Sequence, residues 1–147
     1  MLRNEYYSHQ QNHFWRIIGE ILDFDPGDTY AARVNALREA RIAVWDVLRS
    51  CERPGALDSS IVVRTAEVND FVGFVSAHPR LRRIVFNGAT AERLFRKRVM
   101  PSLGGAVERI DLVRVPSTSP ANASIPLSQK LAEWRTACAI WTTSLSV

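Results

Sequence analysis

The stretch that decides the fold class reads RIVFNGATAERLFRKR over residues 83–98 and is followed by IDLVRV over residues 110–115. RIVFN and IDLVRV are short runs rich in β-branched residues, which predict two buried strands. Between them, a helix opens at Gly88 and runs to about Arg98, and its expected buried positions are Ala91, Leu94 and Phe95. Strands that alternate with helices predict an α/β domain with a largely parallel sheet.

The flanking sequence extends this pattern on both sides. Helices are predicted over residues 14–22, from about Thr29, after an N-cap at Asn69, and over residues 127–140. The apolar run IAVWDVL over residues 42–48 predicts a third strand, buried on both faces. The fold class is therefore a three-layer α/β domain with a small, mostly parallel central sheet between helices. Because nothing before Phe14 resembles a strand, the sheet is expected to lack its first strand.

Composition narrows the class of protein. The 147 residues fit a single domain, and the net charge of +4 with a pI near 9.6 favours an acidic partner such as nucleic acid. No apolar run has the roughly 20 residues that a bilayer requires, and no secretory signal is visible, so we expect a cytoplasmic protein without membrane contact. Two isolated cysteines are too few for a zinc or iron–sulfur site, so we expect neither metal nor cofactor.

The carboxyl ends of the strands are the expected place for a site. The segments that follow them are CERPGALDSSI, NGATAE and PSTSPANAS, all rich in small and polar residues. In the last of these, Ser117, Thr118 and Ser119 could hold a phosphate, while the ordinary alternative is a Ser/Pro turn supported by Asn122.

A second candidate region is the aromatic segment YYSHQQNHFW over residues 6–15. Aromatic rings there could stack a base while an amide or imidazole reads its edge. The alternative, favoured by the residues alone, is an aromatic anchor that holds this segment on the core. The basic clusters at residues 80–83 and 96–98 would suit DNA, but solvated helix ends look the same.

Taken together, these segments resemble the hypoxanthine-DNA glycosylases of the uracil-DNA glycosylase superfamily. YYSHQQNHFW is similar to the family's Tyr-Tyr-Ala-His-Pro-Arg-Asn-x-Phe-Trp, and WDVLRSCERPGALDSSI to its Trp-Asp-Val-Leu…Cys-x-Arg-x-Gly-Ser-Leu-Asp-Ser-x-Ile. NDFVGFVSAHPRLRRIVFNG resembles the family's Asn-Asp-Phe…His-Pro…Phe-Asn-Gly segment, and VPSTSPANAS its second signature loop. Four matches in order are more specific than any one of them.

The resemblance implies hydrolysis of the N-glycosidic bond of a flipped-out deaminated base in DNA, without metal or cofactor. Hypoxanthine would be the base, with uracil or xanthine as further candidates. Asn12 would orient the attacking water, and Asn87 would read the base edge. The base pocket would be completed by Tyr7, His9 and Phe14. The DNA backbone would be held by Ser117, Thr118, Ser119 and Asn122. We expect the protein to act as a monomer.

Three departures from the family pattern leave an alternative open. The family begins with a strand and a Gly-Ser-x-Pro-Gly loop that this chain lacks, so residues 1–147 are expected to form one domain, truncated at its N-terminus relative to the family. Gln10-Gln11 replaces Pro-Arg, and Ala56 replaces a serine. The alternative is a catalytically impaired homologue that only binds DNA. A small-molecule α/β enzyme is disfavoured because the usual phosphate-loop motifs are absent.

Overall fold

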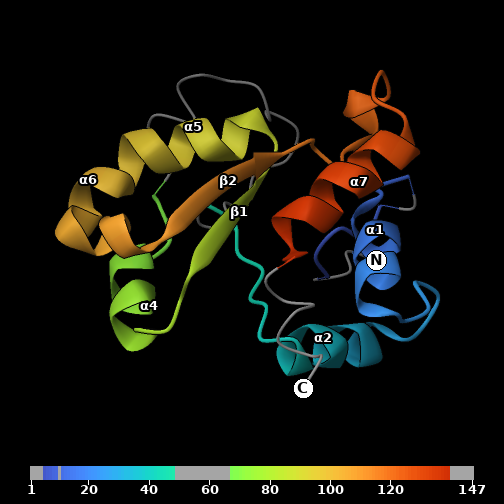
Figure 1. Ribbon diagram of the computed structural model, residues 1–147, viewed down its shortest axis with the longest axis horizontal. Helices are drawn as coiled ribbons and strands as arrows, with labels where there is room; N and C mark the ends of the chain where they lie inside the picture. The colour runs from blue at the N-terminus through green and yellow to red at the C-terminus, as the bar shows by residue number, and fades with distance from the viewer. Residues whose placement is uncertain (1–4, 10, 49–66, 140–147) are drawn as a thin grey trace.

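The computed structural model describes residues 5–9, 11–48 and 67–139 (Figure 1). The structure confirms the predicted helices at residues 14–22 and 89–98 and the predicted strand at residues 83–87. It also confirms the helices predicted to begin near Thr29 and Leu127 and the strand predicted to begin near Ile110. In chain order the elements are α1 (Phe14–Leu22), α2 (Tyr30–Glu39), α4 (Phe71–Ala77), β1 (Arg83–Asn87), α5 (Ala89–Arg98), α6 (Met100–Leu103), the 3-10 helix η1 (Gly104–Arg109), β2 (Asp111–Val115), the 3-10 helix η2 (Pro120–Asn122) and α7 (Leu127–Ala137).

The two strands form a parallel sheet with helices on both faces. The register runs from Arg83 opposite Asp111 to Asn87 opposite Val115. In Figure 1, α4, α5 and α6 lie on one side of the sheet, and α1 and α7 lie on the other. Alternate side chains of a strand point to opposite faces, so each strand contributes to two cores. This three-layer arrangement confirms the predicted α/β fold class.

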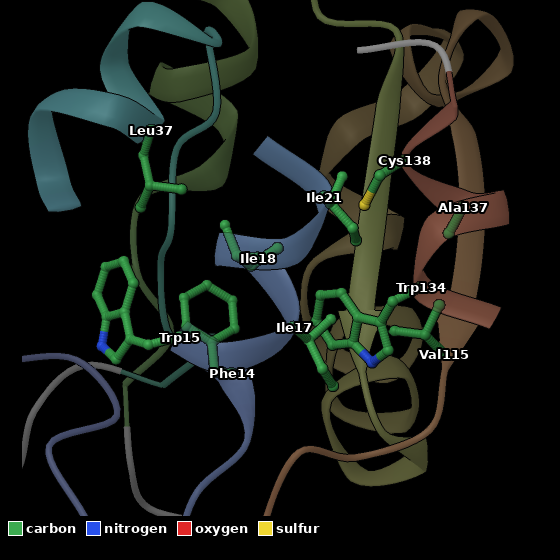
Figure 2. Packing of buried hydrophobic residues seen from close by; sticks show 10 residues of the cluster. All are labelled: Phe14, Trp15, Ile17, Ile18, Ile21, Leu37, Val115, Trp134, Ala137 and Cys138. Carbon is green, nitrogen blue, oxygen red and sulfur yellow. The ribbon is translucent and has the colours of Figure 1, made fainter. Parts of the chain in front are cut away.

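The first core lies between the sheet and helices α1 and α7 (Figure 2). Its apolar side chains come from one stripe of α1, from α7 and from the end of β2. The indole of Trp134 packs edge-on against Phe14 and its Nε1 donates to the backbone oxygen of Pro116 at 2.9 Å. The core therefore also holds the beginning of the loop after β2 in place.

The second core lies on the opposite face of the sheet. It is formed by buried side chains from α4, β1 and α5 and from the residues after α5, namely Val75, Phe86, Phe95, Val99, Leu103 and Ile110. Leu112 of β2 packs against it, whereas Val113 packs against the first core. Both cores thus share the same pair of strands.

The predicted strand over residues 42–48 is wrong. Within the part of the chain that the structure describes, the segment pairs only through an isolated antiparallel bridge between Leu48 and Val68. Its apolar residues are explained by packing, since Ile42 and Val44 contact the first core and Val47 contacts the second. Apolar β-branched side chains favour a strand, but a strand also needs a neighbouring strand to pair its backbone N–H and C=O groups. Among the described residues, β1 pairs only with β2, so the segment at 42–48 does not join the sheet.

The expected N-cap at Asn69 is wrong by one residue. Helix α4 is capped by Asp70, whose carboxylate accepts from the backbone N–H of Gly73 at 2.9 Å. The Asn69 amide instead donates to the backbone oxygen of Asp46 at 2.7 Å, and its backbone N–H donates to that of Val47 at 3.0 Å. Asn69 therefore supplies hydrogen bonds that a neighbouring strand would otherwise supply to this segment.

Candidate functional site at the carboxyl ends of the strands

The loops after β1 and β2 begin side by side, as the parallel sheet predicts. Asn87 and Val115 are partners in the register, and the backbone N–H of Gly88 donates to the oxygen of Val115 at 3.0 Å. Gly88 has φ +96°, a conformation that residues with a Cβ rarely adopt. A Cβ at this position would also lie 3.0 Å from the Cβ of Ser117. Glycine is therefore what allows the two loops to approach this closely.

Asn87 and Thr118 form a clasp between these loops. The backbone N–H of Thr118 donates to Asn87 Oδ1 at 2.8 Å, and Asn87 Nδ2 donates to Thr118 Oγ1 at 2.9 Å. A backbone N–H can only donate, so this contact fixes which amide atom of Asn87 is the oxygen. Asn87 Nδ2 also donates to the hydroxyl of Tyr7 at 3.2 Å, which brings the N-terminal segment to the same point.

Tyr7 and Phe14 form the aromatic side of the site. Their rings stack with centroids 4.1 Å apart and an angle of 29° between the planes. Tyr7 adopts φ 55°, so the chain makes a tight bend that turns its ring inward. Burial raises the pKa of the Tyr7 phenol above its usual value, and the hydrogen bond from Asn87 partly opposes this shift. The phenol is consequently neutral at physiological pH and presents a hydroxyl rather than an oxyanion.

Asn12 lies at the start of α1, beside the loop after β2. Its Oδ1 accepts from the backbone N–H of Phe14 at 3.0 Å, and the backbone N–H of His13 donates to the oxygen of Thr118 at 3.0 Å. A carbonyl oxygen has two lone pairs, and only one donor to Asn12 Oδ1 is seen within the described ranges, so one acceptor position faces no described donor. His9 lies near but is exposed, and its Nδ1 accepts from the backbone N–H of Gln11 at 3.2 Å. In its neutral form the ring therefore carries its proton on Nε2.

The residues of the loop after β2 differ in what they can reach. Thr118 is completely buried, so its hydroxyl serves the clasp. Ser117 and Ser119 are partly exposed, and each hydroxyl accepts a backbone N–H two residues further on, at 3.1 and 3.2 Å. The amide of Asn122 donates to the oxygen of Ser117 at 3.2 Å, which closes the loop on itself.

A cleft of about 380 Å³ opens next to Asn12. Helix α1 and the residues before it form one wall, and the loop after β2 and α7 form the other. The lining residues are Gln11, Asn12, His13, Arg16, Pro120, Ala123 and Lys130.

Sequence reasoning missed His13, Arg16 and Lys130. A signal for Lys130 was present, because it occupies the apolar stripe of α7, three residues after Leu127 and four before Trp134. A charged residue at such a position is uncommon unless something pairs with it.

Other kinds of site are not seen in the described parts of the chain. Within residues 5–9, 11–48 and 67–139, no group of His, Cys, Asp and Glu side chains is arranged to hold a metal ion. None of the helices described has both the length and the apolar character that a membrane crossing needs. The predicted loop CERPGALDSSI, with Ala56, lies wholly outside the described residues.

Comparison with solved structures defines the class of protein. A candidate uracil DNA glycosylase from Methanosarcina acetivorans, solved by NMR in solution, superposes with a TM-score of 0.69 at 30% sequence identity. The similarity covers 93% of the present chain and 80% of that chain. The fold is thus that of a uracil DNA glycosylase-like protein.

Comparison with curated proteins defines the family. The hypoxanthine DNA glycosylase of Methanosarcina acetivorans is 36% identical over 116 residues, which cover 73% of this chain and 72% of that protein. The hypoxanthine DNA glycosylase of Methanosarcina barkeri is 34% identical over 87 residues, covering 58% and 54%. No family model matches the chain. The chain belongs to the hypoxanthine DNA glycosylases, which confirms the family predicted from the sequence.

Proposed function

We propose that this protein is a DNA repair glycosylase that removes hypoxanthine from DNA by hydrolysing its N-glycosidic bond. Membership of the family supports the reaction. The observation that carries it to this chain is the meeting of the N-terminal segment with the loops after β1 and β2. Asn87 donates to Tyr7 and Thr118, and His13, the neighbour of Asn12, donates its backbone N–H to the oxygen of Thr118. Uracil and xanthine are the further bases to test, because they also arise by deamination.

In the proposed reaction, the second acceptor position of Asn12 Oδ1 orients a water molecule toward C1′ of the deoxyribose. The water oxygen forms a bond to C1′ while the bond from C1′ to the base nitrogen breaks. The bonding electrons leave with the base, and the proton lost by the water balances the charge of the departing base. An amide does not take this proton, so Asn12 acts by position and by the dipole of its carbonyl.

The base would enter from the DNA in a flipped-out conformation and stack on the ring of Tyr7, which rests in turn on the buried ring of Phe14. Asn87 would read its edge, and the exposed His9 would contact it from the outside. Ser117, Ser119 and Asn122 would meet the sugar-phosphate backbone. Because Thr118 is buried, we assign it the positioning of Asn87 rather than a DNA contact.

The proposed partner is DNA that contains deaminated bases, and no cofactor is required. We further propose that the chain works as a monomer with a single domain, since the described elements share one sheet and two adjoining cores. Its place of action would be the cytoplasm.

The test is release of a base from duplexes that carry one hypoxanthine, uracil or xanthine, followed by alkaline cleavage of the abasic site. We expect cleavage at hypoxanthine by the wild type and a loss of at least about 100-fold in Asn12→Ala, because a positioning dipole is removed. Asn35→Ala is the matched control, since Asn35 is an exposed amide on α2 bonded to Glu39. DNA binding without base release by the folded wild type would favour the alternative of an inactive DNA-binding homologue.

A further inference from the structure

Lys130 is a fully buried cation on the apolar stripe of α7. Its side chain is 0% exposed, and its Nζ has no hydrogen-bond partner among the described residues. Burial of a charge without a partner is costly in free energy. We therefore expect an anionic group from outside the described residues to neutralise the charge of Lys130.

Two further cationic or polar groups line the same cleft. His13 Nδ1 is also buried and without a partner among the described residues, and Arg16 lies exposed at the rim. Desolvation lowers the pKa of His13, and repulsion from Lys130 and then Arg16 lowers it further. Among the described residues that line the cleft, none carries a carboxylate. The cleft therefore concentrates positive charge and unpaired donors in one place.

We propose that this cleft binds one phosphate of the DNA backbone, adjacent to the nucleotide whose glycosidic bond faces Asn12. The inference rests on the proposed function, because Asn12 forms part of the same wall. Every deoxyribose is flanked by phosphates, so a sugar placed at Asn12 brings one of them to the cleft. Pro120 and Ala123 form the opposite side and belong to the loop expected to meet the DNA.

The three groups would act on the phosphate in different ways. Arg16 at the rim offers forked donors that match phosphate oxygens. His13 Nδ1 donates a hydrogen bond when it carries the ring proton. Lys130 is buried behind the wall of the cleft. Protein rather than water surrounds its charge, so the charge attracts a phosphate more strongly at a given distance. The phosphate in return supplies the counter-charge that Lys130 lacks.

The experiment measures binding to a duplex with a single 2′-fluoro-arabino-inosine, whose glycosidic bond resists hydrolysis. In a set of duplexes, each phosphate around the lesion is replaced in turn by an uncharged methylphosphonate. We expect one replacement to weaken binding of the wild type about tenfold. Lys130→Met should bind the duplex with the natural backbone about tenfold more weakly than the wild type does. Its affinity should not change further when that same phosphate is replaced. Arg135→Met is the control, because it removes one exposed cation from the same helix outside the cleft.

The outcomes separate a phosphate contact from a merely structural role. If Lys130→Met keeps the wild-type sensitivity to every methylphosphonate, or weakens binding equally on all backbones, the proposal is overturned. Methionine is unbranched like lysine and only one atom shorter, and it removes a charge that has no partner among the described residues, so we expect Lys130→Met to melt no lower than the wild type. Should it fail to fold, Arg16→Met at the exposed rim is read in the same way, and unchanged sensitivity there overturns the proposal.

Failure of the proposed function would look different. A wild type that shows the expected methylphosphonate pattern but releases no base supports the phosphate site and contradicts the glycosylase activity. Conversely, the protein could release the base while no methylphosphonate replacement has an effect on binding that depends on Lys130 or Arg16. That result supports the activity and overturns the phosphate site.

Discussion

His13 joins two parts of the site through different atoms. Its backbone N–H donates to Thr118, which is part of the clasp, while its ring lines the cleft beside Lys130 and Arg16. The position of the ring is therefore fixed by the backbone, and its protonation depends on the charges around it. His13 is for this reason a reporter of the electrostatics of the cleft.

We expect the pKa of His13, followed by NMR of its ring protons, to lie below 6.5 and to rise toward that value in Lys130→Met. Removal of the ammonium removes a repulsion that disfavours the protonated ring, whereas desolvation persists. Arg135→Met should leave the pKa where it is. An unchanged pKa in Lys130→Met would show that the two groups do not interact.

The same shift affects stability with a definite sign. Because the pKa is lowered in the folded state, the unfolded chain binds a proton more readily at this histidine. The free energy of unfolding should then fall as the pH drops from about 6.5 toward the folded-state pKa of His13. In His13→Gln this part of the decrease should disappear, which urea unfolding at a series of pH values would measure.

At the level of neighbouring elements, the most important contact is the one between the loops after β1 and β2. The hydrogen bond from Gly88 to Val115 and the clasp of Asn87 with Thr118 both depend on it. These loops follow strand ends that are 28 residues apart in the sequence, Asn87 and Val115, so only the folded sheet brings them together.

Gly88→Ala should lower the free energy of unfolding by about 1–3 kcal/mol, since alanine would have to adopt a strained φ. Its Cβ would also press against Ser117 and push the loops apart, so base release should fall more than stability explains. Gly105→Ala is the matched control, because nothing lies within 4 Å of its added Cβ. Urea unfolding and base release of both variants measure the effect. Equal stability of the two would contradict the argument.

The elements that could be predicted from the sequence are those determined by local pattern. Helix α1 and strand β1 have their predicted bounds, because amphipathic spacing and β-branched runs act over a few residues. The segment at 42–48 was misjudged because a strand depends on a distant partner as well as on its own residues. The sequence assigns Asn87 to the base edge and Thr118 to the DNA backbone and gives no sign of the clasp, because their mutual contact and the burial of Thr118 arise from tertiary packing.

Across the whole molecule, the two cores lie on opposite faces of the same two strands. Unfolding of either core would therefore expose one face of the sheet to water. Cys138 is a probe of this unit. It is 0% exposed in the first core, and burial raises the pKa of its thiol to about 12. Only the thiolate reacts with common thiol reagents, so reaction requires the core to open.

In a Cys51→Ser variant, which leaves Cys138 as the single thiol, we expect labelling at pH 8 to be at least about 100-fold slower than in urea-unfolded protein. The rate should increase with urea along the unfolding curve measured by circular dichroism. Rapid labelling while the circular dichroism remains native would mean that the first core opens independently of the second.

The clasp has a consequence for the choice of base. Both hydrogens of the Asn87 amide nitrogen are already engaged, one by Tyr7 and one by Thr118. A base that Asn87 is to read must therefore displace an internal ligand, and the contact at 3.2 Å to Tyr7 is the longer of the two. Under the proposed function, the Tyr7 hydroxyl would compete with the base for Asn87, and a base without an acceptor in the right place would not displace it. Selectivity would then depend on the difference between two hydrogen bonds, so Tyr7→Phe should admit ordinary bases more readily.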